Sequence, residues 1–442
     1  MCTEASRCRK KPRLMRAEAT KNTATPEAYL PHEIVTDILT RLPVKSLLRF
    51  RCVCKAWRRT ISDDPAFVRA HLHHQPSTLL VLPLLGEDDE EYMYMSYRRR
   101  RPPSQRYASN KKKIAFYRWA PSSDTDATLV HAADMLTEHN DVPHHDALPQ
   151  CDGLVLVPAG DKVHLFNPAA RQAVALPWSP GSVAPLGFRL RLPRPHQALG
   201  LGHDPRSGTY KAARFFYREV FAVATSTYAL TTGMEVLTVG ADSRWRELTE
   251  EPPYPAIPDR AATFHKGSLL WTVDERFLPR HGAAAPGFLR FSLEDESFGV
   301  TPAPPCHPRL DYASSNLTEL RGELCVARME PNTRLLELWM TDDAVHPRWD
   351  RRYAIHVMNE LPRPPRPVAM LDDGILFHDR GFDDANGFIS VYDFKTRVYK
   401  DTVQMNRLKY HGDGTTTTID YPRPPFSYFF LLPYRDSLVR IH

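Results

Sequence analysis

The segment Leu30–Leu72 constrains the fold more than any other part of the chain, because its apolar residues recur at the spacing of an α-helix. Ile34, Ile38 and Leu42 follow one another every four residues and lie on one face of a helix. Proline suits the first helical position, where no amide donor is needed, so this helix is expected to run from Pro31 to about Arg41. The apolar face of such a helix requires a packing partner.

Two more short helices are expected in the same segment, because Pro43 breaks the first one. Their apolar residues are Val44, Leu47, Leu48, Val53, Cys54, Trp57 and Ile61, and Asp63-Asp64-Pro65 ends the third helix. A module of roughly 40 residues is below the size at which a single core supplies enough stability. It must therefore pack on the rest of its chain or dock its apolar face on a partner.

These residues resemble the F-box of plant F-box proteins. The resemblance rests on Leu30-Pro31, on the run LPVKSLLRFRCVCKAWRRTI that starts at Leu42, and on the closing Asp64-Pro65-x-Phe67. It implies docking on a Skp-type adaptor, and through it on a cullin, in a ubiquitin ligase. Carried over from that family, the adaptor-binding residues are Leu30, Pro31, Ile34, Ile38, Leu42, Pro43, Leu47, Val53 and Trp57. On periodicity alone, an ordinary amphipathic helix bundle is an equal alternative.

The composition fits a globular chain of two or three domains, with 442 residues of which 42% are hydrophobic. No run of about 18 apolar residues occurs, so no membrane-spanning helix is expected. The seven cysteines are odd in number and scattered, which indicates a reducing compartment rather than a disulfide framework. The N-terminal residues lack the apolar core of a secretory signal, so we expect the protein in the cytoplasm, the nucleus or both.

The composition also divides the chain into four parts. Residues 1–27 are basic and poor in apolar residues, which predicts a disordered tail, although its cluster Arg9-Lys-Lys-Pro-Arg13 is alternatively a nuclear localisation signal. The helical module is expected over residues 28–74. Residues 75–150 are expected to be a linker that holds possible first strands of the next domain and a charged loop. Residues 151–442 are a repetitive β domain.

Within this β domain, a strand–turn–strand pattern recurs at spacings of roughly 35 to 55 residues. Each unit alternates apolar and polar residues and then reaches Asp or Asn with Pro, Gly, Ser or Thr, which is typical of half-buried strands ended by turns. The units lie at residues 151–171, 199–211, 235–245, 288–295, 336–342 and 388–396. Gly267, Gly322 and Gly374 each precede three or more apolar residues and predict partner strands. Forty prolines against 20 glycines also favour many short strands over long helices.

Repeats of this length suit a β-propeller of six or seven blades, whereas the strands of a β-sandwich, the alternative, need no such long period. The strings CDGLVL from Cys151 and LFNPAAR from Leu165 resemble the F-box-associated domain that follows the F-box in many plant proteins. This second resemblance implies a domain of Kelch-like, propeller-type character. We therefore expect an α+β multidomain protein in which a small three-helix module precedes an all-β, propeller-like domain.

No familiar catalytic or metal-binding motif is complete. The chain lacks a Gly-x-Ser-x-Gly elbow and a phosphate-binding loop, and His32-Glu33 has no second histidine four residues later. Cys52 and Cys54 lie two apart in an expected helix, do not share a face, and are expected to pack in the core rather than bind a metal. The densest ligand-type cluster lies in a loop, which rarely supplies convergent geometry, and comprises His139, Asp141, His144, His145 and Asp146. No metal or other cofactor is expected.

Two other groups of residues allow a structural and a functional interpretation. Tryptophans recur near strand ends and are expected to pack between blades rather than to form a ligand cage: Trp178, Trp245, Trp271, Trp339 and Trp349. The run Arg98–Arg101, with tyrosines nearby, has the chemistry to stack and hold single-stranded nucleic acid. No nucleic-acid-binding fold signature surrounds it, so an exposed loop is favoured.

Together, the two resemblances imply a non-catalytic substrate receptor of a Skp-cullin-F-box ubiquitin ligase. The module would dock on the adaptor, and the β domain would bind a target protein that the sequence does not identify. An adaptor-bound scaffold without a degradation target is the alternative. An enzyme that uses a propeller pocket is disfavoured by the missing motifs, and neither membrane nor nucleic-acid binding is expected.

Overall fold

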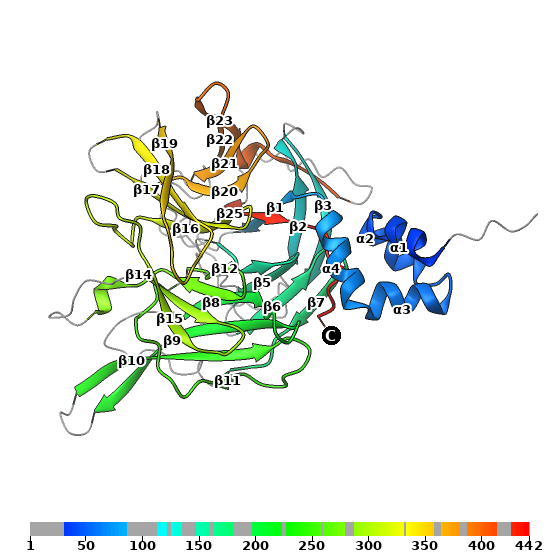
Figure 1. Ribbon diagram of the computed structural model, residues 1–442, viewed down its shortest axis with the longest axis horizontal. Coiled ribbons are helices and arrows are strands. Elements are labelled where there is room, and N and C mark those ends of the chain that lie inside the picture. The colour runs from blue at the N-terminus through cyan, green and yellow to red at the C-terminus, as the bar shows by residue number, and fades with distance from the viewer. Residues whose placement is uncertain are drawn as a thin grey trace, which may run out of the picture.

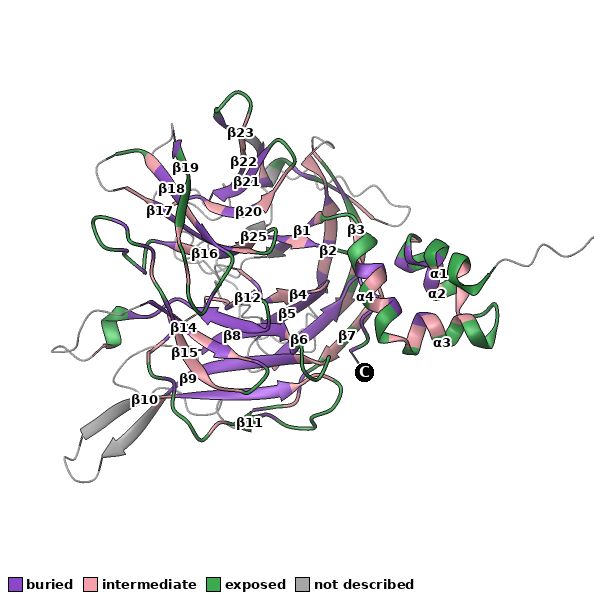
Figure 2. Cartoon of the chain, viewed as in Figure 1, coloured by how far each residue is buried: buried purple, intermediate pink, exposed green. Residues whose placement is uncertain are grey.

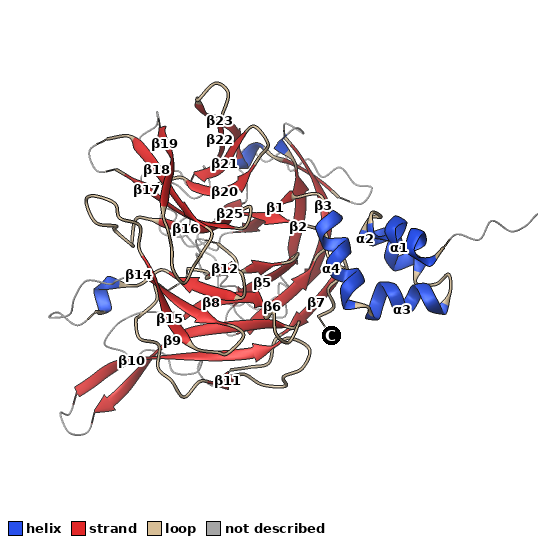
Figure 3. Ribbon diagram, viewed as in Figure 1, coloured by secondary structure: helices blue, strands red, loops and turns tan. Residues whose placement is uncertain are grey.

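The computed structural model describes residues 31–85, 113–121, 125–134, 147–159, 162–179, 197–222, 227–258, 260–278, 287–330, 333–357, 364–379, 387–412 and 426–441. In this part of the chain, four α-helices come first, and strands with two short 3-10 turns follow (Figure 3). The strands form six sheets, the blades of a β-propeller, and the helices lie at one side of it (Figure 1). The expected helical module followed by an all-β propeller is thus confirmed, and the β-sandwich alternative is wrong.

The module contains α1 (His32–Thr40), α2 (Val44–Phe50), α3 (Lys55–Asp63) and α4 (Pro65–His74). The fourth helix goes beyond the three that the sequence predicts, and Asp64 explains it. The Asp64 Oδ1 accepts hydrogen bonds from the amides of Ala66 (2.9 Å) and Phe67 (3.3 Å), and Pro65 occupies the first helical position. The Asp-Pro pair therefore ends α3 and begins α4.

The two neighbouring cysteines of the module lie in the turn between α2 and α3, not in a helix. Cys52 and Cys54 are both exposed. The Cys54 Sγ accepts a hydrogen bond from the amide of Trp57 at 3.4 Å, so this side chain caps the start of α3. The expectation that the two cysteines pack in a helix core is therefore wrong.

Five blades are four-stranded antiparallel sheets, named here from the innermost strand outward. Blade 2 is β4 (Gln150–Cys151), β5 (Leu154–Ala159), β6 (Lys162–Asn167) and β7 (Gln172–Ala175). Blade 3 is β8 (Gln197–His203), β9 (Tyr210–Ala222), β10 (Thr227–Thr238) and β11 (Arg246–Glu247). Blade 4 is β12 (Thr263–His265), β13 (Ser268–Trp271), β14 (Gly287–Ser292) and β15 (Phe298–Pro302). Blade 5 is β16 (Asn316–Leu320), β17 (Glu323–Met329), β18 (Leu335–Thr341) and β19 (Asp350–His356). Blade 6 is β20 (Arg366–Met370), β21 (Gly374–Asp379), β22 (Phe388–Asp393) and β23 (Tyr399–Gln404).

Blade 1 combines strands from both ends of the propeller sequence. Its strands are β25 (Phe426–Tyr434), β1 (Thr78–Leu85), β2 (Lys113–Trp119) and β3 (Asp126–Asp134), with β24 (Lys409–His411) parallel to β3 at the outer edge. The pairing of β25 with β1 runs from Thr78 opposite Tyr434 to Leu85 opposite Phe426. Residues 75–150 therefore include β1, β2 and β3, where the sequence indicated possible first strands, and β25 closes the ring.

Three blades use the same two-residue turn between their first two strands. Asp152-Gly153, Lys266-Gly267 and Arg321-Gly322 all have positive φ. Two successive residues with positive φ form a type I′ turn, whose twist matches the right-handed twist of the flanking strands. The expectation that Gly267, Gly322 and Gly374 introduce partner strands is confirmed, because β13 and β17 follow the first two and β21 begins at the third.

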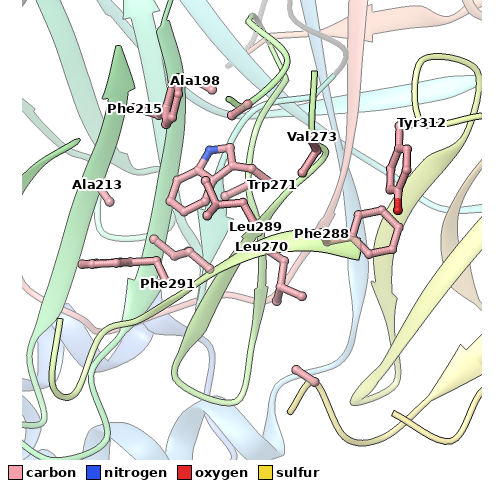
Figure 4. Close-up of a cluster of buried hydrophobic side chains, with 14 of the residues drawn as sticks. Ala198, Ala213, Phe215, Leu270, Trp271, Val273, Phe288, Leu289, Phe291 and Tyr312 are labelled. Carbon is pink, nitrogen blue, oxygen red and sulfur yellow. The ribbon is translucent and has the colours of Figure 1, made fainter. Parts of the chain in front are cut away.

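Neighbouring blades pack face to face through large apolar side chains. Trp271, which is 1% exposed, lies with Phe215, Phe288 and Phe291 in a cluster that joins blades 3 and 4 (Figure 4). Gly200 permits this approach, because a Cβ there would lie 2.8 Å from Leu269 Cδ1 and 3.0 Å from Trp271 Cζ2. Gly200 therefore serves blade packing.

Four of the tryptophans expected between blades do pack there. Trp245 and Trp271 are buried, and Trp339 and Trp349 are half-buried against the same apolar cluster as Trp271. Trp178 is 55% exposed, so the expectation is wrong for this residue. Trp245 is buried near this segment instead, because its Nε1 donates a 2.8 Å hydrogen bond to the carbonyl oxygen of Pro177, the residue before Trp178.

The propeller has two unlike ends. The turns between the first and second strands of a blade, such as 152–153 and 266–267, lie at the end that we call the tight-turn end. Connections from one blade to the next, such as 248–262 and 303–315, are longer and leave from the opposite, long-loop end. The helical module joins β1 at the tight-turn end, and the β9–β10 hairpin extends in the opposite direction (Figure 1).

Candidate functional site

The helical module builds its own small core and completes it with a residue from the far end of the chain. The buried side chains of this core are Leu39, Val44, Leu47, Ile61, Phe67 and Leu438. Leu438 follows β25, so the propeller supplies part of the support that the module lacks by itself. One face of the module is thus already occupied by its own chain.

The module leaves large apolar side chains in solvent, and Figure 2 shows exposed residues on all four of these helices, whereas the strands are coloured largely as buried or intermediate. Ile34 is 49% exposed, Ile38 47% and Val53 60%. Pro31 and Pro43 are also exposed. The core of the module is complete without these isoleucines, so their exposure indicates a surface that a partner covers.

The remaining residues of the expected adaptor interface are placed differently. Leu42 and Trp57 are half-buried, with Trp57 packed 5.6 Å from the ring of Phe50. Leu47 has no exposed surface, so its side chain supports the module core and cannot contact a partner directly, which corrects that assignment. Leu30 lies outside the described residues.

Two contacts hold the module together and against the propeller. His71 is fully buried on α4, and its Nε2 lies 2.9 Å from the carbonyl oxygen of Leu42, which ties α4 to the connection between α1 and α2. Burial lowers the pKa of His71, so the ring stays neutral in this position. Asp63 at the end of α3 pairs with Arg440 at 3.1 Å. Both members of this pair are about half exposed, so it contributes little stability, and the burial of Leu438 matters more.

Asn167 anchors the segment that carries Leu438 and Arg440, here called the closing segment (Arg435–Ile441). The fully buried Asn167 Nδ2 donates to the carbonyl oxygens of Ser437 (3.1 Å) and Val439 (2.7 Å). Its Oδ1 accepts from the amide of Ala170 at 3.1 Å, within the turn between β6 and β7. One side chain of blade 2 therefore fixes both the turn and the closing segment.

Replacing Asn167 by alanine should destabilise the protein by about 2 kcal/mol, because two buried carbonyl groups lose their donor. Chemical denaturation measures this cost, and amide hydrogen exchange should report faster exchange in α1 to α4. Asn316→Ala removes one side-chain bond to the Pro364 carbonyl, far from the module, and serves as a control that leaves the helices unaffected. Equal exchange in the helices of both variants would contradict the anchoring role.

The propeller surrounds a central cavity of about 830 Å³, lined mainly by residues from β4, β12, β16, β20 and β25 and their turns. Its lining mixes apolar side chains with charged ones of both signs, including Asp152, Lys266 and Glu319. Burial raises the pKa of Glu319, whose carboxylate also accepts a hydrogen bond from the Gly322 amide. The described part of this lining presents no nucleophile held by a general base.

Several sites considered from the sequence fall outside the described residues: the basic tail 1–27, the run Arg98–Arg101, and the histidine and aspartate cluster from His139 to Asp146. Among the residues that are described, no three His, Cys, Asp or Glu side chains gather as metal ligands would. None of the helices in this part of the chain is long and apolar enough to cross a membrane. At the long-loop end, Phe277 is 42% exposed and packs on Tyr217.

Sequence comparison is consistent with this arrangement. Residues 106–365 match the family profile described as F-box associated beta propeller domain, and residues 29–69 match the F-box domain. The chain is 22% identical over 376 residues to the putative F-box protein At1g12855 of Arabidopsis thaliana, a match that covers 78% of this chain and 75% of that protein. It is 25% identical over 415 residues to the F-box protein At2g34280 of the same plant, covering 84% and 93% respectively. Among solved structures, it is similar to that of YjhT, with a TM-score of 0.39 and 10% identity over 63% of this chain and 90% of that one.

Proposed function

This chain belongs to the F-box associated β-propeller family, with an F-box before the propeller, and we propose that it is the target receptor of a Skp-cullin-F-box ubiquitin ligase. In this proposal the module docks on a Skp-type adaptor, and the long-loop end of the propeller binds the target protein. The chain itself performs no covalent step. F-box proteins are generally non-catalytic receptor or adaptor subunits.

One observation supports the proposal most directly: the core of the module is complete, and yet two isoleucines of α1 remain exposed. The inward side of the module is closed by its own side chains and by Leu438, so packing among the described residues does not account for Ile34 and Ile38. Exposed side chains of this size, together with the exposed Pro31 and Val53, offer the apolar area on which a stable interface depends. Interface energy is commonly concentrated in a few such side chains.

The arrangement of the two ends supports the second half of the proposal. The module occupies the tight-turn end, whereas the longer connections between blades leave from the opposite end. A target bound there would be held on the adaptor complex without obstructing the docking face. Tethering raises the effective concentration of the target's lysines near the ubiquitin carrier that the ligase supplies, which is how a non-catalytic subunit accelerates the transfer.

Assembly tests the proposal directly. Purified full-length protein mixed with a Skp-type adaptor and a cullin should elute as one complex in size-exclusion chromatography. Failure of the wild-type protein to bind the adaptor would contradict the proposal. If the complex forms, proteasome inhibition should raise the abundance of proteins captured by the propeller. Unchanged abundance would instead assign the chain to a scaffold role without a degradation target.

A further inference from the structure

The surface of the module is strongly polarised in charge. Helices α2 and α3 and the turn between them carry six cations, all exposed except the half-buried Arg51: Lys45, Arg49, Arg51, Lys55, Arg58 and Arg59. We call this surface the basic face. The ion pairs of the described module involve other residues, Arg41 with Asp37 at 3.2 Å and Arg440 with Asp63 at 3.1 Å. The basic face thus has no ion-pair partner within the described part of the chain.

The arrangement of these cations is unfavourable for the isolated module. Lys45 and Arg49 are four residues apart on α2, and Lys55 lies three and four residues before Arg58 and Arg59 on α3. Like charges at these spacings face each other and destabilise a helix. Lys55 is also the first residue of α3, where the helix dipole repels a cation and where no acidic residue occurs in the first turn. A negatively charged partner would relieve this repulsion.

The basic face includes an exposed apolar residue. Val53, which is 60% exposed, stands in the turn between Arg51 and Lys55, so apolar contact and positive charge coincide there. Helix α1 differs, because its exposed Ile34 and Ile38 are accompanied by acidic residues, Glu33 and Asp37. A partner that covers both surfaces must therefore be apolar opposite α1 and acidic opposite α2 and α3.

We propose that the basic face docks on an acidic surface of the adaptor, next to the surface that covers the exposed isoleucines, and that these charges chiefly set the rate of association. This inference rests on the proposed function and names the chemistry of the adaptor surface. Exposed charges act over about 8 Å at physiological ionic strength, so they orient the approaching partner before apolar contact begins. Apolar contacts between the two surfaces then determine how slowly the complex dissociates.

Charge reversal of two exposed residues, Lys55→Glu with Arg58→Glu, tests the inference. In stopped-flow or biosensor kinetics with the adaptor, this variant should associate roughly tenfold more slowly at low salt, with little change in dissociation. Its association rate should also depend less on salt than that of the wild type. The matched control is Arg244→Glu with Lys395→Glu, which changes net charge equally on exposed turns of the propeller and should leave the rate nearly unchanged.

Each outcome separates this inference from the proposed function. Adaptor binding with equal association rates in wild type, variant and control would overturn the basic-face inference and leave the receptor proposal standing. Absence of adaptor binding by the wild type would contradict both. Duplex RNA and vesicles with phosphatidylserine are tested in parallel. Binding to either one that charge reversal abolishes, with unaltered adaptor kinetics, would assign the basic face to a polyanion and overturn the proposed partner.

Discussion

Replacing Ile34 and Ile38 together by aspartate should lower the affinity for the Skp-type adaptor by roughly 100-fold or more, because central apolar side chains at interfaces often contribute 2 kcal/mol or more each. Both side chains are about half exposed on α1 and do not belong to the buried module core. The substitutions should therefore leave the fold intact, with an unchanged thermal midpoint. Titration of the adaptor against purified variant measures the affinity, and far-UV circular dichroism checks the helices.

The chain offers a closely matched control for this experiment. Val345 and Val398 are 46% and 50% exposed, on turns of blades 5 and 6 outside the module, and their double aspartate variant should bind the adaptor like the wild type. A loss of affinity below about threefold for Ile34→Asp with Ile38→Asp would rule out α1 as the docking face. An equal loss in the control would mean that the effect is a general one of added negative charge.

The second large effect is expected in blade 3, where Glu235→Ala should destabilise the protein by about 3–5 kcal/mol. The Arg214 Nη2 donates to the Glu235 Oε2 at 2.6 Å, and the two side chains are 2% and 1% exposed. Removing the carboxylate leaves a guanidinium buried beside Trp245, whose ring centroid lies 5.5 Å from the Arg214 Cζ. Urea denaturation, followed by tryptophan fluorescence, measures the change in unfolding free energy.

The double variant Arg214→Met with Glu235→Leu separates the loss of a pair from the burial of an unpaired charge. Apolar side chains of similar size can replace a buried ion pair at little cost, so the double variant should be more stable than Glu235→Ala alone. A double variant at least as unstable as the single one would show that the pair itself supports blade 3. A cost below 1 kcal/mol for Glu235→Ala would mean that solvent reaches Arg214 despite its burial.

Local pattern was sufficient to predict the first three helices of the module and the hairpins of the propeller. Helix breaks at Pro43 and Pro65, and turns at Gly267 and Gly322, depend on neighbouring residues in the sequence, and the structure has them where expected. The strand–turn units likewise predicted a propeller, because each unit lies within a single blade, although residues 199–211 and 235–245 share blade 3 and no unit lies in blade 1. Six blades, the lower of the two expected numbers, are formed.

Features that depend on distant parts of the chain could not be predicted in this way. The pairing of β1 with β25 joins Thr78 to Tyr434, and the sequence pattern of neither strand indicates the other. The burial of Leu47 in the module core, beside exposed Ile34, also depends on three-dimensional packing, since both residues belong to the same apolar pattern. Leu438 and Asn167, which support the docking surface, carry no local signal of that role.

The closing strand β25 also has a consequence for the order of events during synthesis. A ribosome releases the chain from its N-terminal side, so the module emerges long before β25 and the closing segment. Until residues 426–441 are made, blade 1 lacks its innermost strand, and the module core lacks Leu438. A truncated product therefore has neither a closed ring nor a fully supported docking face. Closure of the ring and completion of the module core therefore occur together, at the end of synthesis.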